Sequence, residues 1–270
     1  MGFYDEFYRY YDHIFPHSQE KEEFLLEQFS SLPDEASLLD MGCGTGTYSI
    51  ALQKKGFDVV GIDLEEEMID RSREKTAREN MELEPRFKIL DMRDLDVLYS
   101  PGSFSGAYSL GNVLVHLTDE DNIRAVLEKL NRILLTPGRI VIQIVNYDRI
   151  LSRGVTELPT ISAEDQGVEF ERRYRYDEEN NIIKFRTKLT VENPEDEEPR
   201  SIQGPNIISG GDQQERVFTN TIDLYPLQSS EVEDMLSAAG FQEIEFYGSF
   251  QCEEFQPDES FPLIITAWKK

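Results

Sequence analysis

The sequence contains little of what metal-binding, disulfide-rich or membrane proteins need. Only two of its 270 residues are cysteine and three are histidine, and their spacing matches no metal-ligand pattern. Two cysteines cannot build a disulfide framework, so we expect a reducing, cytoplasmic setting. No apolar run approaches the roughly 18–20 residues that span a bilayer, and the acidic, aromatic first residues are unlike a secretory signal. We therefore expect neither a bound metal nor a membrane partner.

Positive charge is also scarce. Lys and Arg number 27 against 53 Asp and Glu, which gives a net charge of −26. Such a surface repels nucleic acid unless basic residues are concentrated in one patch, and the densest basic run, within residues 171–175, is short and alternates like one face of a strand. We predict no nucleic-acid partner. A cationic or amine ligand suits this charge better, although acidic surfaces commonly serve solubility alone.

What the chain does contain is a glycine-rich turn at residues 38–46, with the sequence LLDMGCGTG. An apolar strand ends in three glycines spaced every second residue, and a helix begins at Thr47. A second strand, residues 57–63, ends in Asp63. Glycines let the backbone approach a ligand closely, and a carboxylate at the tip of the next strand can accept both hydroxyls of a ribose. The pattern predicts a nucleotide-type site.

Glycine spacing narrows the class of ligand. A dinucleotide fingerprint has glycines at the first, third and sixth places, whereas the sixth place here is Thr47. That residue argues against a nicotinamide-dependent oxidoreductase, the alternative reading of such a turn. The order acid, x, Gly, x, Gly, x, Gly, which starts at Asp40, resembles motif I of the class I S-adenosylmethionine-dependent methyltransferases.

Strand and helix patterns alternate up to about residue 146, after a helix that Ser18 caps. Strands are expected near 37–41, 57–63, 86–91, 104–110 and 139–146, separated by helices near 46–55, 65–79 and 120–135. Such alternation implies right-handed crossovers and a parallel sheet, with ligands bound at the carboxyl ends of the strands. The predicted fold is therefore α/β, a Rossmann-like, doubly wound and mostly parallel sheet.

The pattern then changes to antiparallel strands joined by a hairpin turn. They are expected at 167–176, 181–192 and 214–225, followed by a helix at 229–239 and strands at 241–248 and 261–269. This predicts three parts: a cofactor-binding core with an N-terminal helical cap, an antiparallel β insert that acts as a lid or substrate platform, and a last segment that completes the core sheet. Their bounds are 1–150, 151–227 and 228–270.

The resemblance to class I methyltransferases also implies roles for single residues. It implies S-adenosyl-L-methionine as the cofactor, with its ribose held by Asp63 and its adenine packed on Leu64. Asp91 would then read the adenine amine while Met92 covers the adenine face. The other cofactor residues that it implies are Asp40, Gly42, Cys43, Gly44 and the backbone of Leu110. Cys43 is expected to be a small residue in a tight turn and no nucleophile.

A narrower resemblance runs through nearly the whole chain. Leu110-Gly111-Asn112, followed by His116-Leu117, is similar to the LGNSxxHL stretch of glycine N-methyltransferases, and residues 146–151 are similar to their NYDxIL. Tyr225-Pro226 and Gly248-Ser249-Phe250 match their YYPH and GDFK segments in the same order. The resemblance implies a small-molecule methyltransferase with nitrogen favoured over oxygen as the acceptor atom.

The sequence departs from that family at two places. An arginine that pairs with the substrate carboxylate precedes the family's NYD, and Val145 stands there instead, so glycine is not the expected acceptor. A second family arginine neutralises the cofactor's carboxylate. It aligns near His17, and the alternative residue for binding the cofactor's carboxylate is Tyr11 or its neighbour Tyr10.

Methyl transfer needs an aligned nucleophile in a dry pocket more than an acid–base pair, and we expect no catalytic triad. Asn112 is the candidate for holding the nucleophile, or else it caps the following helix. His116 either accepts a proton or belongs to that helix. Tyr147 and Tyr225 either line the acceptor pocket or pack in the core.

Other functions remain open at this point. The chain could be a small-molecule O-methyltransferase or a catalytically silent protein that binds the cofactor. A methyltransferase that acts on exocyclic amines of nucleic-acid bases would have Asn or Asp followed by two prolines, whereas Val113 follows Asn112 here. The sequence leaves the choice between a monomer and a homo-oligomer undecided.

Overall fold

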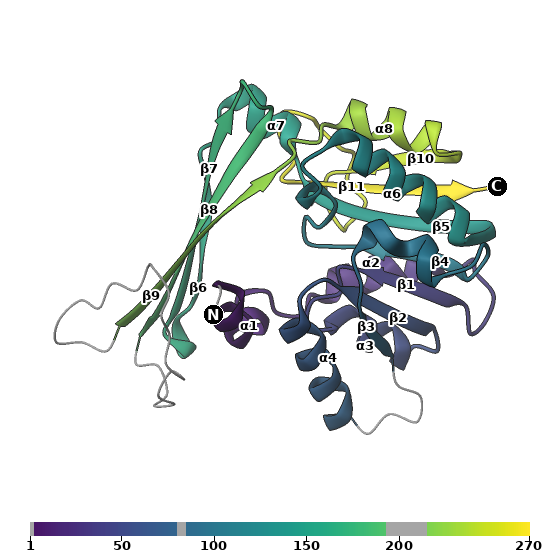
Figure 1. Cartoon of the computed structure of the whole chain (residues 1–270), viewed down its shortest axis with the longest axis horizontal. Helices are drawn as coiled ribbons and strands as arrows, with labels where there is room; N and C mark the ends of the chain where they lie inside the picture. The colour runs from purple at the N-terminus through teal and green to yellow at the C-terminus, as the bar shows by residue number, and fades with distance from the viewer. Residues whose placement is uncertain (1–2, 80–84, 193–214) are drawn as a thin grey trace. The chain divides into compact units, whose positions relative to one another are not determined.

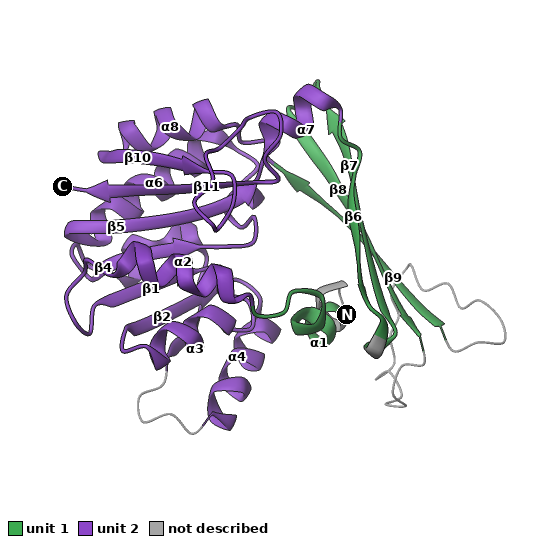
Figure 2. Cartoon of the chain, turned by 180° about the vertical axis from the view of Figure 1, so that it is seen from behind, with its two compact units in different colours: residues 1–17, 155–224 green, residues 18–154, 225–270 purple. Residues whose placement is uncertain are grey.

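The computed structural model describes residues 3–79, 85–192 and 215–270. They fall into two compact units, which Figure 2 shows in different colours. The core unit comprises residues 18–154 and 225–270, and the insert unit comprises residues 1–17 and 155–224. Each unit is described by itself below.

The core unit is built on one seven-stranded sheet (Figure 1). Its strands are β1 (Ser37–Met41), β2 (Asp58–Asp63), β3 (Arg86–Ile89), β4 (Phe104–Ser109), β5 (Leu134–Val145), β10 (Phe241–Tyr247) and β11 (Pro262–Lys269). The strand order is β10-β11-β5-β4-β1-β2-β3, and only β11 runs antiparallel to its neighbours β5 and β10. The order reverses between β1 and β4, and ligands of open α/β sheets bind at such a reversal.

Helices cover both faces of this sheet, as the alternating pattern predicted. They are α2 (Gln19–Phe29), α3 (Thr47–Lys54), α4 (Glu66–Arg78), α5 (Leu95–Leu98), α6 (Glu120–Ile133), α7 (Tyr147–Arg153) and α8 (Ser229–Ala238), with single 3-10 turns at Met92–Asp94 and Leu114–His116. Figure 1 shows α6 and α8 in front of the sheet, and Figure 2 shows α2 and α3 on the opposite side. The Rossmann-like, doubly wound fold is confirmed.

Apolar spacing and capping explain where the helices lie. In α6 the buried residues recur every three or four positions, and Asp119 caps the helix by accepting from the Asn122 N–H at 3.2 Å. Ser18 caps α2 in the same way, with 3.4 Å to the Lys21 N–H, as the sequence predicted. The apolar face of α2 then packs Phe24 and Phe29 onto the sheet.

Some element boundaries differ from the expected ones. β5 begins at Leu134, where a helix was expected to continue, because a register shift lets Phe104 pair with Leu134 ahead of the regular ladder. The sequence also gave no sign of α7, which begins directly after β5. Its N-cap is Asn146, whose side chain accepts from the Arg149 N–H at 3.2 Å. The NYDRIL segment therefore forms a capped helix.

The insert unit holds a separate four-stranded antiparallel sheet in the order β6-β7-β8-β9. Its strands are β6 (Glu157–Ala163), β7 (Val168–Asp177), β8 (Ile182–Glu192) and β9 (Glu215–Leu224). The last three confirm the expected antiparallel strands. β6 was missed because Pro159 and a register shift between Leu158 and Ile161 interrupt its alternation.

Helix α1 (Phe3–Ile14) belongs to the insert unit, whereas the sequence suggested that it caps the core. Its aromatic residues explain the difference. The Phe7 ring lies 5.1 Å from the ring of Phe170 on β7, and Phe15 lies 6.0 Å from the same ring. Aromatic packing of this kind stabilises a helix on a sheet beyond simple burial. Along the chain, the core unit ends at residue 154 and resumes at residue 225, whereas the sequence placed these boundaries at 150 and 228.

Two findings concern the described residues as a whole. Within residues 3–79, 85–192 and 215–270, no helix is both long and apolar enough to cross a membrane. The same residues contain no group of three or more His, Cys, Asp or Glu side chains arranged to hold a metal ion.

Candidate active site

The glycine turn links the end of β1 to the start of α3. Gly42, Gly44 and Gly46 all have positive φ, of 77°, 53° and 76°. The turn is fixed to β2 by the Gly42 and Cys43 N–H groups, which donate to the Ile62 carbonyl at 2.8 and 2.9 Å. A Cβ on Gly42 would lie only 2.4 Å from Cγ1 of Val113, so glycine is required there for space as well as for conformation.

The third glycine of the turn serves packing. A Cβ on Gly46 would lie 2.6 Å from the Phe87 ring, and a Cβ on Gly61 of β2 would lie 2.7 Å from the same ring. Phe87 belongs to β3 and packs with Ile50 of α3 and Ile69 of α4. These glycines therefore let α3 pack closely against β2 and β3.

Asp63, at the end of β2, points its carboxylate back at the turn. Its Oδ2 accepts from the Gly44 N–H at 2.8 Å, and its Oδ1 accepts from the Glu65 N–H at 3.1 Å. Burial raises the pKa of this carboxyl, and the backbone N–H groups oppose that rise. Each oxygen still has a lone pair for a further donor, so the carboxylate is held ready for two hydroxyls.

Apolar and acidic side chains continue along the ends of β2 and β3. Leu64 directly follows Asp63 and is 60% exposed, so its apolar surface is open to a ligand. Asp91 caps the turn that begins at Met92, and both are partly buried. The Arg93 guanidinium lies 2.6 Å from Asp91 and lowers its pKa, so this carboxylate already has a cationic partner.

Asp40 lies within the protein beneath the glycine turn. It is 4% exposed, and its Oδ2 accepts from the Ser49 hydroxyl of α3 at 2.6 Å. Burial raises the pKa of Asp40 to about 7. The neighbouring Cys43 thiol has its pKa raised by burial as well, which makes it a poor nucleophile. Asp40 thus joins β1 to α3 and supports the turn from below.

The loop after β4 carries Asn112, whose φ is +70°. Its Oδ1 accepts from the Val145 N–H at 2.9 Å, and its Nδ2 donates to the Tyr147 hydroxyl at 3.0 Å. Gln143 of β5 fixes the same loop by accepting from the Gly111 N–H at 2.9 Å. The expected alternative, a helix cap, is not what this side chain does, because the following 3-10 turn has Val113 at its N-cap.

The NYD segment holds three parts of the core together. Asn146 donates to the carbonyls of Pro257 and Ser260, both at 2.8 Å. Tyr147 is 0% exposed, and its hydroxyl accepts from the Asn112 amide at 3.0 Å, so its ring packs in the core. Asp148 accepts from the Ser229 N–H at 2.9 Å at the start of α8. Each side chain of the segment fixes a different loop.

Tyr225 directly follows β9, and His116 ends the 3-10 turn after β4. The two side chains differ in burial. The Tyr225 N–H donates to the Val115 carbonyl at 2.8 Å. The Tyr225 ring is buried, and its hydroxyl donates to the carboxylate of Glu231 on α8 at 3.1 Å. Burial raises the pKa of Tyr225, so it stays protonated. His116 is exposed at the end of its 3-10 turn, and the surrounding protein desolvates it enough to lower its pKa. Its imidazole is therefore neutral at neutral pH and able to accept a proton.

The structure thus gathers most of the predicted residues at the carboxyl ends of the core strands. Asp63 is the last residue of β2, and the glycine turn begins directly after β1. Within three residues of the end of β2, β3 or β4 lie Leu64, Asp91, Met92, Leu110 and Asn112. Leu110 is partly buried and packs against the core cluster of α2. Tyr11 and His17 belong to the insert unit, where Tyr11 packs its ring 5.7 Å from Phe7, and a cofactor role for either remains a prediction.

Comparison with known proteins agrees with this geometry. The family described as "Methyltransferase domain" matches residues 38–138. A glycine/sarcosine N-methyltransferase of Aphanothece halophytica is 27% identical over 229 residues, which are 85% of this chain and 75% of that enzyme. The glycine N-methyltransferase of Mus musculus is 34% identical over 128 residues, or 43% of each chain.

A solved S-adenosylmethionine-dependent methyltransferase from Clostridium acetobutylicum ATCC 824 has the same fold, with a TM-score of 0.75 and 15% identity over 98% of both chains. The chain is a class I S-adenosylmethionine-dependent methyltransferase. The residues at the strand ends fit that cofactor, since the turn offers glycine backbone, Asp63 two free lone pairs and Leu64 an exposed apolar surface.

The methyltransferase needs few chemical groups of its own. S-adenosylmethionine supplies the methyl group together with a good leaving group. The protein has to bind the adenosyl part, hold a nucleophile in line and exclude water, and correct positioning alone can supply roughly 7–11 kcal/mol of the barrier. A fixed amide such as Asn112 and a neutral imidazole such as His116 suit that task.

The sequence gave no reason to single out Lys21, which the structure places near the turn. Its ammonium on α2 faces the rings of Tyr48 at 6.0 Å and Phe250 at 5.5 Å, and burial lowers its pKa. Tyr48 is the second residue of α3, directly after the turn, and accepts from the Ser18 N–H at 3.2 Å. Within the described parts of the chain Lys21 forms no ion pair, whereas Lys55 pairs with Glu22 at 3.4 Å.

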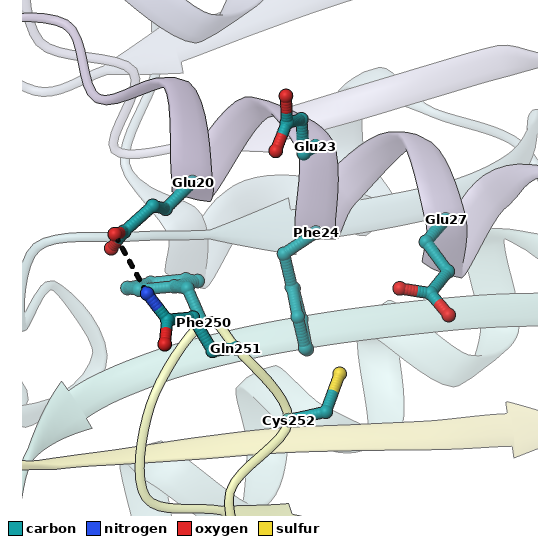
Figure 3. Close-up of a pocket in the computed structure, with 7 residues that line it drawn as sticks. All are labelled: Glu20, Glu23, Phe24, Glu27, Phe250, Gln251 and Cys252. Carbon is teal, nitrogen blue, oxygen red and sulfur yellow. Dashed lines mark hydrogen bonds between the residues drawn. The ribbon is translucent and has the colours of Figure 1, made fainter.

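The methyltransferase also has an acidic hollow of about 410 Å³ beside α2. Figure 3 shows glutamates of α2 above the loop that carries Cys252, with Gln251 donating to Glu20 at 2.9 Å. The lining residues are Glu20, Glu23, Phe24, Glu27, Phe250, Gln251 and Cys252. None of them belongs to the glycine turn or to the ends of β1 to β4.

Proposed function

We propose that this methyltransferase transfers the methyl group of S-adenosylmethionine to an amine nitrogen of a small molecule, held by Asn112. The observation that carries the proposal is the fixed amide of Asn112. Its Oδ1 accepts the Val145 N–H at 2.9 Å and, through a longer bond of 3.3 Å, the Tyr147 hydroxyl, and an amine can replace that longer bond. The printed activities of the relatives, glycine and sarcosine N-methylation, support nitrogen as the acceptor atom.

Glycine itself is not the proposed acceptor. Val145 offers an isopropyl side chain where the resemblance places an arginine, and its backbone N–H is already donated to Asn112. A carboxylate has no guanidinium at that point, so its recognition there is lost. The acceptor is therefore an amine other than glycine, or an amine whose acidic group is bound elsewhere in the chain.

The experiment is a transfer assay with methyl-labelled S-adenosylmethionine and matched pairs of primary amines and alcohols. We expect label on nitrogen, located by mass spectrometry, and a clear loss of rate in Asn112→Ala. Label on hydroxyl groups alone would identify an O-methyltransferase. Cofactor binding without any labelled product would identify a catalytically silent protein.

We further propose that residues 155–224 hold the acceptor, as the predicted substrate platform. This unit has its own sheet and aromatic packing, so it does not need the core unit to form a buried face. Hydrogen exchange with and without an accepted amine tests this proposal. Protection of β7 and β8 by the amine supports it, and protection confined to the core unit contradicts it.

A further inference from the structure

One row of residues crosses the buried face of the insert unit's sheet. In antiparallel strands, directly paired residues lie on the same face. Leu158 pairs with Arg172, Arg172 with Thr187, and Thr187 with Asn220. These four residues therefore form a cross-strand row, the Arg172 row, that runs over β6, β7, β8 and β9. Three of its four side chains are polar.

Apolar side chains flank the Arg172 row on both sides. One neighbouring row contains Phe170, Leu189 and Phe218, and the other contains Tyr174, Phe185 and Ile222. The Tyr174 and Phe185 rings lie 5.1 Å apart, and Phe170 also receives Phe7 of α1. Polar groups thus occupy the middle of an otherwise aromatic and aliphatic surface.

Two buried polar atoms of this row, on Thr187 and Arg172, have no hydrogen-bond partner. Thr187 is 5% exposed, and its Oγ1 forms no hydrogen bond in the described parts of the chain. Arg172 donates one bond, from Nη2 to the Pro159 carbonyl at 2.8 Å, while its Nε is buried and unpaired. Burial lowers the pKa of Arg172, and among the described residues no carboxylate pairs with it. The side chain is partly buried, and its Nε is withdrawn from water without a hydrogen-bond partner, which is unfavourable.

This lack of a partner is unexpected in a chain with 53 acidic residues. The next residue, Arg173, lies exposed on the opposite face and pairs with Glu171 at 3.1 Å. The acidic residue of this strand segment, Glu171, thus lies on the exposed face with Arg173, and the neighbours of Arg172 along its own face are Phe170 and Tyr174. Buried polar atoms without a hydrogen-bond partner are typical of ligand sites, because a bound ligand can supply the missing partner.

We propose that the Arg172 row binds the carboxylate of a small acid with an apolar body. Arg172 donates its remaining N–H groups to the carboxylate, Thr187 adds a hydroxyl, and the flanking rings contact the apolar part. That this acid is the methyl acceptor rests on the proposed function.

The test uses the full chain without cofactor and a pair of probes of equal shape, benzoate and benzamide, titrated by ligand-observed NMR. We expect benzoate to bind about tenfold more tightly than benzamide, since hydrogen bonds to charged groups are the stronger ones. Arg172→Met should remove this preference, and Thr187→Val should reduce it. Arg173→Met is the matched control and should leave it unchanged.

The outcomes separate the row from the proposed function. Equal affinities of the two probes for the wild-type chain would overturn the inference, as would an unchanged benzoate affinity in a folded Arg172→Met chain. Circular dichroism confirms the fold of each variant, and Arg172→Lys provides a second test if Arg172→Met does not fold. Benzoate binding through Arg172 without any methyl transfer would support the row and contradict the proposed function.

Discussion

Asn112 and Tyr147 are joined by a hydrogen bond of 3.0 Å, from the Asn112 amide to the phenolic oxygen. Tyr147 is fully buried, and Asn112 is also held by the Val145 N–H. The bond therefore connects the loop after β4 to α7, the helix after β5. Both segments follow the carboxyl ends of neighbouring parallel strands, the end of the sheet at which ligands bind. It fixes the orientation of the amide that we propose to hold the acceptor.

Tyr147→Phe removes this bond while it keeps the buried ring. We expect kcat to fall roughly three- to tenfold, the effect of one hydrogen bond, because the amide loses a fixed orientation. The KM for S-adenosylmethionine should not change, since the bond that is removed joins Tyr147 to Asn112 of the loop after β4. Tyr99→Phe is the control, because the Tyr99 ring lies 4.9 Å from Phe104 at the opposite end of β4. A normal kcat in Tyr147→Phe would show that the bond does not position Asn112.

Asp63→Asn tests the ribose contact. The amide has one acceptor atom where the carboxylate has two, so we expect the affinity for S-adenosylhomocysteine to fall about ten- to a hundredfold. Isothermal titration measures the change. Asp58→Asn is the control on the same strand, because Asp58 pairs with Arg86 at its opposite end. Equal losses in the two variants would mean that the effect comes from the strand and not from the ribose.

Lys21→Met tests whether the unpaired ammonium beside Tyr48 neutralises the carboxylate of the cofactor's methionine part. We expect weaker binding of S-adenosylhomocysteine, by about tenfold, because a charge-assisted bond is lost. Binding of 5′-methylthioadenosine, which lacks that carboxylate, should stay the same. Lys55→Met serves as the exposed control. If both nucleosides lose affinity equally, Lys21 acts on the fold of the turn instead.

Asp40→Asn tests the buried carboxyl beneath the turn. Burial raises its pKa from 3.8 to about 7 in the folded chain. Its contribution to stability is therefore fully present below the unfolded pKa and is lost as the pH rises through the folded pKa, by up to about 1.4 kcal/mol per pH unit. Chemical denaturation at a series of pH values measures it, with the wild type losing stability relative to Asp40→Asn between pH 3.8 and 7. Parallel curves for the two proteins would place the pKa of Asp40 near its ordinary value.

The cofactor half of the site could be predicted because its signals are local. The spacing of Gly42, Gly44 and Gly46 and the acid at the end of the next strand lie within 24 residues, from Asp40 to Asp63, and each is set by backbone conformation. Parallel strands then bring their carboxyl ends to one edge, so that the ends of β1 to β4 had to meet.

The acceptor half could not be predicted in the same way. Asn112 and Tyr147 are 35 residues apart, and nothing in their spacing shows that one binds the other. On the cofactor side Lys21 was missed as well, because it is one charged residue on an ordinary amphipathic helix. Gln143 left a trace in the sequence, as the polar residue within the apolar run 140–145.

The sequence by itself determined the fold class, the glycine turn and the carboxylate that follows it, because local periodicity and glycine conformation specify them. Only the tertiary structure decided that α1 packs with the antiparallel sheet, that Tyr147 is buried against Asn112, and that Arg172 lies unpaired beside Thr187. Those relationships depend on strand register and side-chain packing between distant segments, which no local pattern encodes.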